Sequence, residues 1–159
     1  MKRREFITLL GGAAELPMAA RAQQGDRVRR IGVLMPVDEN DPLAETFLSA
    51  FTQALSDLGW TDGRNVRIDL RWGRADINRI RALAQQLVGL QPDIIVANGT
   101  AATAAVQRET RTIPIVFANV ADPVAISIVA RLDRPNGNIT GFATNWASAS
   151  SSARFEWHM

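Results

Sequence analysis

One short segment, Asn98-Gly99-Thr100-Ala101, combines residue types that hold small anions. A glycine lets the backbone approach a ligand closely, while a threonine hydroxyl and the free N–H groups at a helix start can hold a carboxylate or phosphate. The same residues are also typical of a helix start in which Gly99 turns the chain and Thr100 is the N-cap, with no ligand. The tetrapeptide alone leaves both interpretations open.

A second polar segment, Asn119 to Pro123, follows the next apolar run of the chain. Asn119 could add a polar contact to a ligand, and Asp122 could hold a ligand amine. An aspartate directly before Pro123 is equally typical of a turn or a cap. This segment is therefore a candidate neighbour of the first one, on the condition that the fold brings the two together.

The sequence has few groups for metal or covalent chemistry. Asp38, Glu39 and Asp41 form a carboxylate cluster, but the spacing lacks the calcium-loop pattern and nothing supplies the remaining oxygens, so a solvated loop is favoured. The chain has no cysteine, and His158 is its one histidine. Thiolate nucleophiles, histidine triads and zinc sites therefore lack support, and we expect neither catalysis nor a metal or cofactor.

Nucleotide and nucleic-acid binding are also disfavoured. The patterns G-x-G-x-x-G and G-x-x-x-x-G-K-[ST] are missing, and no lysine follows Lys2. Four of the 18 basic residues and two of the 16 acidic ones lie within residues 1–22, so the rest of the chain carries 14 of each. A neutral body argues against a nucleic-acid partner.

Apolar periodicity predicts alternating strands and helices. Apolar or period-two runs indicate strands, and three- and four-residue spacing indicates helices. The expected strands are 31–35, 66–72, 93–97, 113–118 and 139–143, and the expected helices are 43–58, 77–90, 101–108 and 125–132. This order predicts an α/β fold with a doubly wound parallel sheet and helices on both faces. We expect 66–72 near a sheet edge and 93–97 covered on both faces.

An open parallel sheet binds ligands at the carboxyl ends of its strands, near the point where the strand order reverses. The loops that follow the first, third and fourth strands are residues 35–41, 98–101 and 119–123. Both polar segments are thus expected at one edge of the sheet.

The two ends of the chain differ from this domain. Residues 1–22 have a basic start, an apolar run from Phe6 to Ala14 and small residues before a cleavage point after about Ala22, as a signal peptide does. The run is shorter than the roughly 18–20 residues that span a bilayer, so membrane contact is expected only during export. Arg3-Arg4 before Phe6 is typical of a twin-arginine signal, with an ordinary Sec signal as the alternative.

The remaining boundaries follow from composition. Residues 23–30 are polar and basic and predict a flexible lead-in. Residues 31–146 form the α/β domain, and 147–159 are an atypical Ser-rich tail without periodicity, which predicts disorder.

Several motifs in one order resemble the ABC transporter substrate-binding proteins of the tryptophan/tyrosine-type family. The likeness runs from residue 1 to about residue 145. Its motifs are MKRREFITLLGGAA (1–14), LGWTDGRNV (58–66), IVANGT (95–100), TIPIVF (112–117), DPV (122–124) and RPNGNITG (134–141).

The resemblance implies a type I periplasmic-binding fold, with two lobes that close on a small ligand and deliver it to an ABC permease of the inner membrane. Residues 31–146 would be lobe one of a protein of the periplasm. By position, Asn98, Gly99, Thr100 and Ala101 resemble the ligand loop of this lobe. Asn119, Asp122 and Pro123 resemble its neighbour, and Thr140, Gly141 and Asn145 resemble the first hinge crossing.

The chain departs from the family pattern after about residue 145. Relatives continue into a second lobe, whereas this chain enters the Ser-rich tail, so we expect a product truncated after lobe one and deprived of half of its ligand contacts. Two other functions remain open, namely a periplasmic ligand-sensing input domain and an exported α/β enzyme. The enzyme alternative has little support, because the sequence contains neither cysteine nor the G-x-S-x-G motif of a nucleophile elbow.

Overall fold

The structure is a computed structural model and describes residues 27–124, 127–128 and 137–144. Its elements along the chain are β1 (Arg29–Met35), α2 (Pro42–Asp57), β2 (Val66–Trp72), α3 (Ile77–Gly89), β3 (Ile94–Asn98), α4 (Gly99–Glu109), β4 (Ile115–Val120) and β5 (Ile139–Ala143). All five predicted strands are confirmed. The signal peptide, the tail and most of the predicted helix 125–132 lie outside the described residues.

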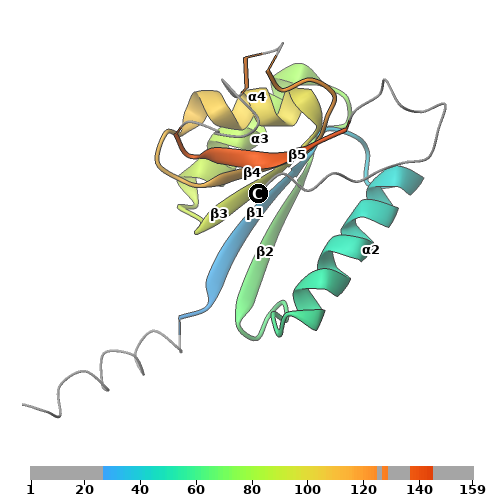
Figure 1. The fold of residues 1–159 in the computed structure, drawn as a ribbon, viewed down its shortest axis with the longest axis vertical. Coiled ribbons are helices and arrows are strands. Elements are labelled where there is room, and N and C mark those ends of the chain that lie inside the picture. The colour runs from blue at the N-terminus through green and yellow to red at the C-terminus, as the bar shows by residue number, and fades with distance from the viewer. Residues whose placement is uncertain (1–26, 125–126, 129–136, 145–159) are drawn as a thin grey trace, which may run out of the picture.

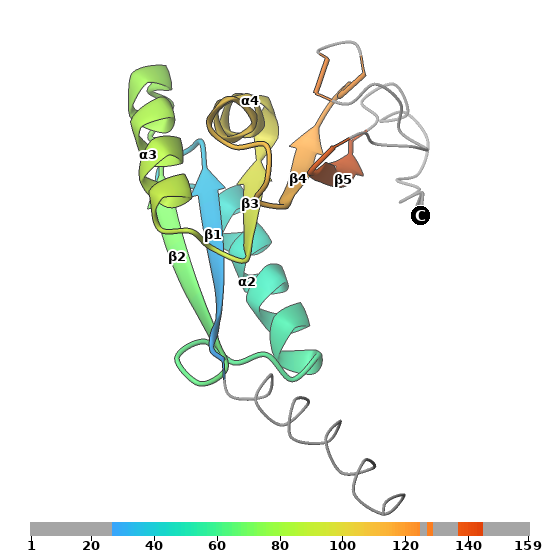
Figure 2. The ribbon, with the colours of Figure 1, turned by 90° about the vertical axis from the view of Figure 1, so that its left-hand side faces the viewer.

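The five strands form one parallel sheet in the order β2-β1-β3-β4-β5. Helices α3 and α4 cover one face and α2 lies against the other, as Figures 1 and 2 show from two sides. The predicted class, a doubly wound parallel α/β sheet, is therefore confirmed. So is the prediction that β2 lies at an edge, and β3 occupies the centre.

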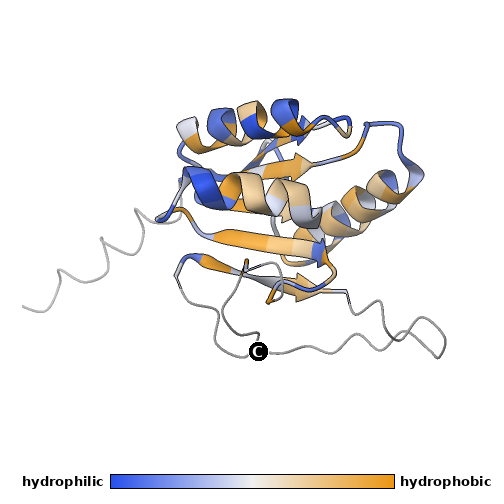
Figure 3. Cartoon of the chain, turned by 90° about the horizontal axis from the view of Figure 1, so that it is seen from above, coloured by the Kyte–Doolittle hydropathy of each residue, from blue (hydrophilic) through white to orange (hydrophobic). Residues whose placement is uncertain are grey.

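The larger part of the core lies between the sheet and the helices α3 and α4. Ile80 and Leu87 of α3 pack there with Ile95 of β3 and Phe117 of β4, all nearly inaccessible to solvent. Figure 3 shows these strands as an apolar layer between more polar helix surfaces. Burial of this apolar area is the main force that holds the layers together.

The opposite face of the sheet is more thinly covered. Phe47 and Phe51 of α2 pack against a cluster that includes Val33 and Met35 of β1, but they are only partly buried, and Ala44 is the single buried residue of α2. Four residues of α3 are buried by comparison. The sheet is therefore anchored chiefly from the α3 and α4 side.

One predicted boundary is wrong. The flexible lead-in was expected to reach residue 30, but β1 begins at Arg29. Asp93 accepts hydrogen bonds from the Arg30 backbone N–H at 2.8 Å and from Arg29 Nη1 at 3.1 Å. These distant contacts hold two polar residues in the strand, although local composition favours a loop.

Among the described residues, no helix has the length and apolar character needed to cross a bilayer.

Candidate functional site

The strand order reverses between β1 and β3. From β1 the chain passes to β2 on one side and then crosses over to β3 on the other. In open parallel sheets the crevice for a ligand lies at this reversal, beyond the carboxyl ends of the two strands. Pro36, which follows β1, and Gly99, which follows β3, therefore flank the candidate site.

The two loops are in contact at this point. A Cβ atom built on Gly99 would lie 3.5 Å from Pro36 Cγ, an ordinary van der Waals separation. Gly99 has a φ of 75°, a left-handed conformation that glycine adopts without strain. This glycine thus turns the chain from β3 directly into α4 and keeps the backbone open at the reversal point.

The start of α4 is the most distinctive part of the site. Asn98 is the N-cap, is only 9% exposed and makes no capping hydrogen bond through its side chain. The first N–H groups of a helix have no partner within the helix, so those of Gly99, Thr100 and Ala101 point out of the sheet edge without a side-chain acceptor. Such an N-terminus attracts anions.

The other two described helices differ in this respect. Asp41 caps α2 by accepting from Leu43 N at 2.9 Å and Ala44 N at 3.3 Å. Asp76 caps α3 in the same way, from Asn78 N at 2.8 Å and Arg79 N at 3.1 Å. Only the helix at the reversal point lacks such a cap in the described part of the chain.

The predicted capping role of Thr100 is wrong. The helix begins at Gly99, so Thr100 is already inside its first turn and its side chain is exposed. A different threonine holds the turn, since Thr103 Oγ1 donates to the Gly99 carbonyl at 2.7 Å. The Thr100 hydroxyl is therefore left at the surface of the candidate site.

The second polar segment lies beside the first. Asn98 and Ala118 are register partners in β3 and β4, so Asn119 follows at the same sheet edge. The prediction of a loop from Asn119 is wrong by two residues, because β4 runs to Val120 and Asn119 sits at an irregularity of the strand with a φ of 56°. The side chains of Asn119 and Asp122 are exposed, whereas that of Pro123 is fully buried.

The predicted hinge residues fall on the last strand. Thr140 and Gly141 lie within β5, paired in register with Val116 and Phe117. Asn145 lies outside the described residues. Strand β5 ends at Ala143, and the N–H of Thr144 still donates to the Val120 carbonyl at 3.0 Å.

The loop after β1 is held by the loop after β2, a feature that sequence reasoning missed. Three backbone bonds join them: Gly73 N to Met35 O at 2.7 Å, Arg74 N to Val37 O at 3.1 Å, and Ala75 N to Pro36 O at 2.7 Å. Two adjacent non-glycine residues, Arg74 and Ala75, have φ values of 53° and 56° to achieve this. No pattern in the sequence signals that conformation.

The carboxylates of the loop after β1 already have protein partners. Arg74 lies 3.6 Å from Asp38 and 3.5 Å from Glu39, and Asp41 caps α2. In the described residues, no group of three or more His, Cys, Asp or Glu side chains is arranged to hold a metal ion. The interpretation of this cluster as part of a surface loop fits the geometry.

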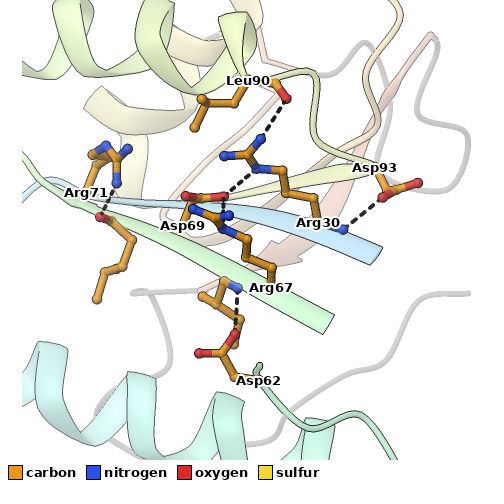
Figure 4. Close-up of polar contacts among 9 residues, drawn as sticks. Arg30, Asp62, Arg67, Asp69, Arg71, Leu90 and Asp93 are labelled. Carbon is orange, nitrogen blue, oxygen red and sulfur yellow. Dashed lines mark hydrogen bonds and ion pairs between the residues drawn. The ribbon is translucent and has the colours of Figure 1, made fainter. Parts of the chain in front are cut away.

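A charged network lies away from the carboxyl edge, on the α3 side of β1 and β2 (Figure 4). Arg30 Nε donates to Asp69 Oδ2 at 2.5 Å, and Arg30 Nη1 donates to the Leu90 carbonyl at 3.3 Å. The hydrogen bond from Arg30 lowers the pKa of Asp69, and the Arg30 backbone N–H lowers the pKa of Asp93. This network joins β1 to β2 and to the start of β3, so its role is structural.

The chain is similar to proteins of one known family. Residues 30–151 match the family model described as ABC transporter substrate binding protein. A curated relative, the tyrosine-binding protein of Clostridioides difficile, is 32% identical over 113 residues, which is 71% of this chain and 32% of the relative. The chain thus spans about a third of the length of this relative.

Two solved structures share the fold. A conserved domain protein from Vibrio cholerae has a TM-score of 0.70 and 29% identity, covering 74% of this chain and 39% of its own. The ABC domain in complex with L-Trp from Streptococcus pneumoniae has a TM-score of 0.68 and 28% identity, covering 72% and 38%. In each case the described sheet and helices match only part of a longer protein.

Proposed function

Because this chain belongs to the family of ABC transporter substrate-binding proteins, we propose that it is a ligand-binding lobe that holds a small, carboxylate-bearing, amino-acid-like solute. The solute lies at the carboxyl edge of the sheet, between the ends of β1 and β3. In the complete receptor a second lobe closes over this edge, and the loaded receptor delivers its solute to an ABC permease. We place the protein in the periplasm, reached by way of the N-terminal signal.

The observation that carries this proposal is the uncapped start of α4 at the strand reversal. A ligand carboxylate there accepts from the N–H groups of Gly99, Thr100 and Ala101, which have no side-chain acceptor from Asn98. The Thr100 hydroxyl adds a donor at the same surface. Each such charge-assisted bond is roughly twice as strong as a neutral one.

The neighbouring strand end supplies the contact for the other end of an amino acid. Asp122 is exposed beyond β4, on the same edge as Asn98. We assign its carboxylate to the ligand amine and the Asn119 amide to a polar contact between the two charges. Pro123 is buried, so its contribution is to the packing of the loop. The proposal of an amino-acid ligand is supported by relatives that are named for tyrosine or hold L-Trp.

The test uses the chain itself and three related probes. L-tryptophan carries both charges, indole-3-propionate lacks the amine, and tryptamine lacks the carboxylate. In a titration followed by amide NMR, L-tryptophan and indole-3-propionate should shift the signals of Gly99, Thr100 and Ala101, and tryptamine should not. Since one lobe supplies only part of the contacts, we expect weak binding, on the order of millimolar.

A variant and an internal control sharpen the result. Asn98→Asp places a carboxylate at the cap, where it competes with the ligand, so the shifts at α4 should disappear. The signals at the starts of α2 and α3, which Asp41 and Asp76 already cap, serve as the control. Equal shifts with tryptamine, or no shifts at α4 in a well-dispersed spectrum, would contradict the proposed site.

A further inference from the structure

Strand β2 forms one edge of the sheet, and its outward-facing groups can be identified from the ladder. Arg29 N donates to the Asn65 carbonyl and Gly73 N donates to the Met35 carbonyl, so the odd-numbered residues of this segment face β1. The N–H and C=O groups of Val66, Ile68, Leu70 and Trp72 therefore point away from the sheet. An exposed row of this kind is a template for pairing with another strand.

The turn before β2 occupies the first part of this row. The Val66 carbonyl accepts from Gly63 N at 2.8 Å, and Val66 N donates to the Thr61 carbonyl at 3.4 Å. Ile68 N donates to Asp62 Oδ1 at 2.8 Å (Figure 4). A side-chain carboxylate thus takes the position that the carbonyl of an added strand would need.

Two arginines bind two of the three other carbonyls of the row. Arg71 Nη1 donates to the Leu70 carbonyl at 2.9 Å, also drawn in Figure 4, and Arg79 Nε donates to the Trp72 carbonyl at 2.8 Å. Five of the eight outward groups therefore have partners within the chain. These partners belong to three different elements, namely the turn before β2, β2 itself and helix α3.

The side chains beside this edge are apolar, so an unblocked edge would favour association with another chain. Ile68, Leu70 and Trp72 line an apolar groove of about 450 Å³ together with Leu48 and Phe51 of α2. They are only partly buried. A paired strand would extend this apolar surface and bury it further, which favours association.

We propose that Asp62 and Arg71 close the β2 edge against a second copy of this chain. Antiparallel pairing of two β2 strands about Leu70 would set Ile68 opposite Trp72 of the partner subunit, with apolar side chains together on one face. It would also require Ile68 N, the Leu70 carbonyl and the Trp72 carbonyl as ladder groups. These are the groups that Asp62, Arg71 and Arg79 already bind.

The experiment opens the edge in the full chain. Asp62→Ala combined with Arg71→Met removes two caps and keeps the aliphatic stem at position 71. We expect sedimentation velocity to change from a monomer to a concentration-dependent dimer, with slower hydrogen exchange at the Leu70 amide. The matched control, Asp57→Ala with Arg67→Met, makes the same charge change without touching an edge group, and should remain monomeric. Asp62→Asn retains an acceptor and should also remain monomeric.

A measurement on the unmodified chain keeps the proposal independent of whether the variants fold. The Ile68 amide is capped by Asp62, whereas the Leu70 amide has no protein partner in the described part of the chain. Ile68 should therefore exchange its proton more slowly than Leu70. Equal exchange at the two amides, or a folded double variant that stays monomeric at the highest soluble concentration, would overturn the proposal.

Discussion

Gly141 of β5 lies so close to Phe117 of β4 that a methyl group on the glycine would be 2.1 Å from the Phe117 carbonyl oxygen and 2.7 Å from its backbone nitrogen. The two residues are register partners in the sheet. Because both atoms belong to the backbone, neither can move aside as a side chain would. The close approach of the last two strands therefore depends on glycine at this position.

Gly141→Ala should accordingly destabilise the fold. The added methyl group has to separate β5 from β4, and overpacking of this kind typically costs about 1–3 kcal/mol of unfolding free energy. Urea unfolding measures the change. Gly89→Ala is the control, since no atom apart from its chain neighbours and the backbone of α3 lies within 4 Å of its Cβ position, and it should be neutral or stabilising by up to about 1 kcal/mol. Equal stability of Gly141→Ala and the wild type would contradict the geometry.

Alanine substitutions of the three N-cap residues should lower the stability of the fold by different amounts. Asp41→Ala and Asp76→Ala each remove a cap with two hydrogen bonds and should lower stability by about 1 kcal/mol. Asn98→Ala removes no capping bond, so its cost should be smaller than either. Thermal unfolding of the three variants tests the order. A loss at Asn98 as large as at Asp41 would show that Asn98 caps α4 in solution.

The Arg30 network predicts how stability depends on pH. The pKa values of Asp69 and Asp93 are lowered in the folded chain, so the unfolded chain, with a carboxyl pKa of about 3.9, takes up protons first as the pH falls. The stabilisation is complete above about pH 5 and is lost as the pH falls, first through the unfolded pKa and then through the lowered folded pKa values. Chemical unfolding at a series of pH values should show this slope.

Asp69→Asn should flatten the slope, because the proton-linked bond to Arg30 is gone. The same substitution at Asp57, on α2 and away from Arg30, is the control and should leave the slope unchanged. If Asp69→Asn retained the full acid dependence, the network would not be its source.

The close contact between Gly73, in the loop after β2, and Ile80 of α3 predicts that substitutions at these two residues have coupled effects on stability. A Cβ on Gly73 would lie 2.4 Å from Ile80 Cγ1 and 3.1 Å from the Met35 carbonyl. Gly73→Ala should therefore lower stability and let the amide protons of Gly73, Arg74 and Ala75, which donate to the loop after β1, exchange faster. In combination with Ile80→Ala, which makes room, the loss should be smaller than the sum of the two single losses. Additive losses in this double-mutant cycle would argue against the contact.

The elements of the fold could be predicted because their signals are local. The alternation of apolar and charged residues in 66–72 and the apolar run before Asn98 identify strands from a few neighbours alone. The start of β1 could not be predicted, since Arg30 is held by Asp69 and Asp93, which are 39 and 63 residues away. A strand that owes its first residues to distant carboxylates shows no periodicity there.

The candidate site divides in the same way. The segments Asn98 to Ala101 and Asn119 to Pro123 could be assigned to one sheet edge from the rule for parallel sheets. The N-cap of α4 could not be predicted. The glycine at position 99 is compatible with more than one helix start, and the backbone conformation makes Asn98 the N-cap. The left-handed conformation of Arg74 and Ala75 also lay beyond sequence reasoning, since neither residue type favours it.

The position of β1 between β2 and β3 has a consequence for the order of folding. As the chain is synthesised, β1, α2 and β2 can associate early, but the second side of β1 has no partner until Ile94–Asn98 has emerged from the ribosome. The pairing of Ile31 with Ile94 then closes a loop of more than sixty residues, a nonlocal step that slows folding. During that interval the second side of β1 is an unpaired apolar edge. The outer groups of β2 are already bound by Asp62 and Arg71, so the growing chain exposes one open strand edge and not two.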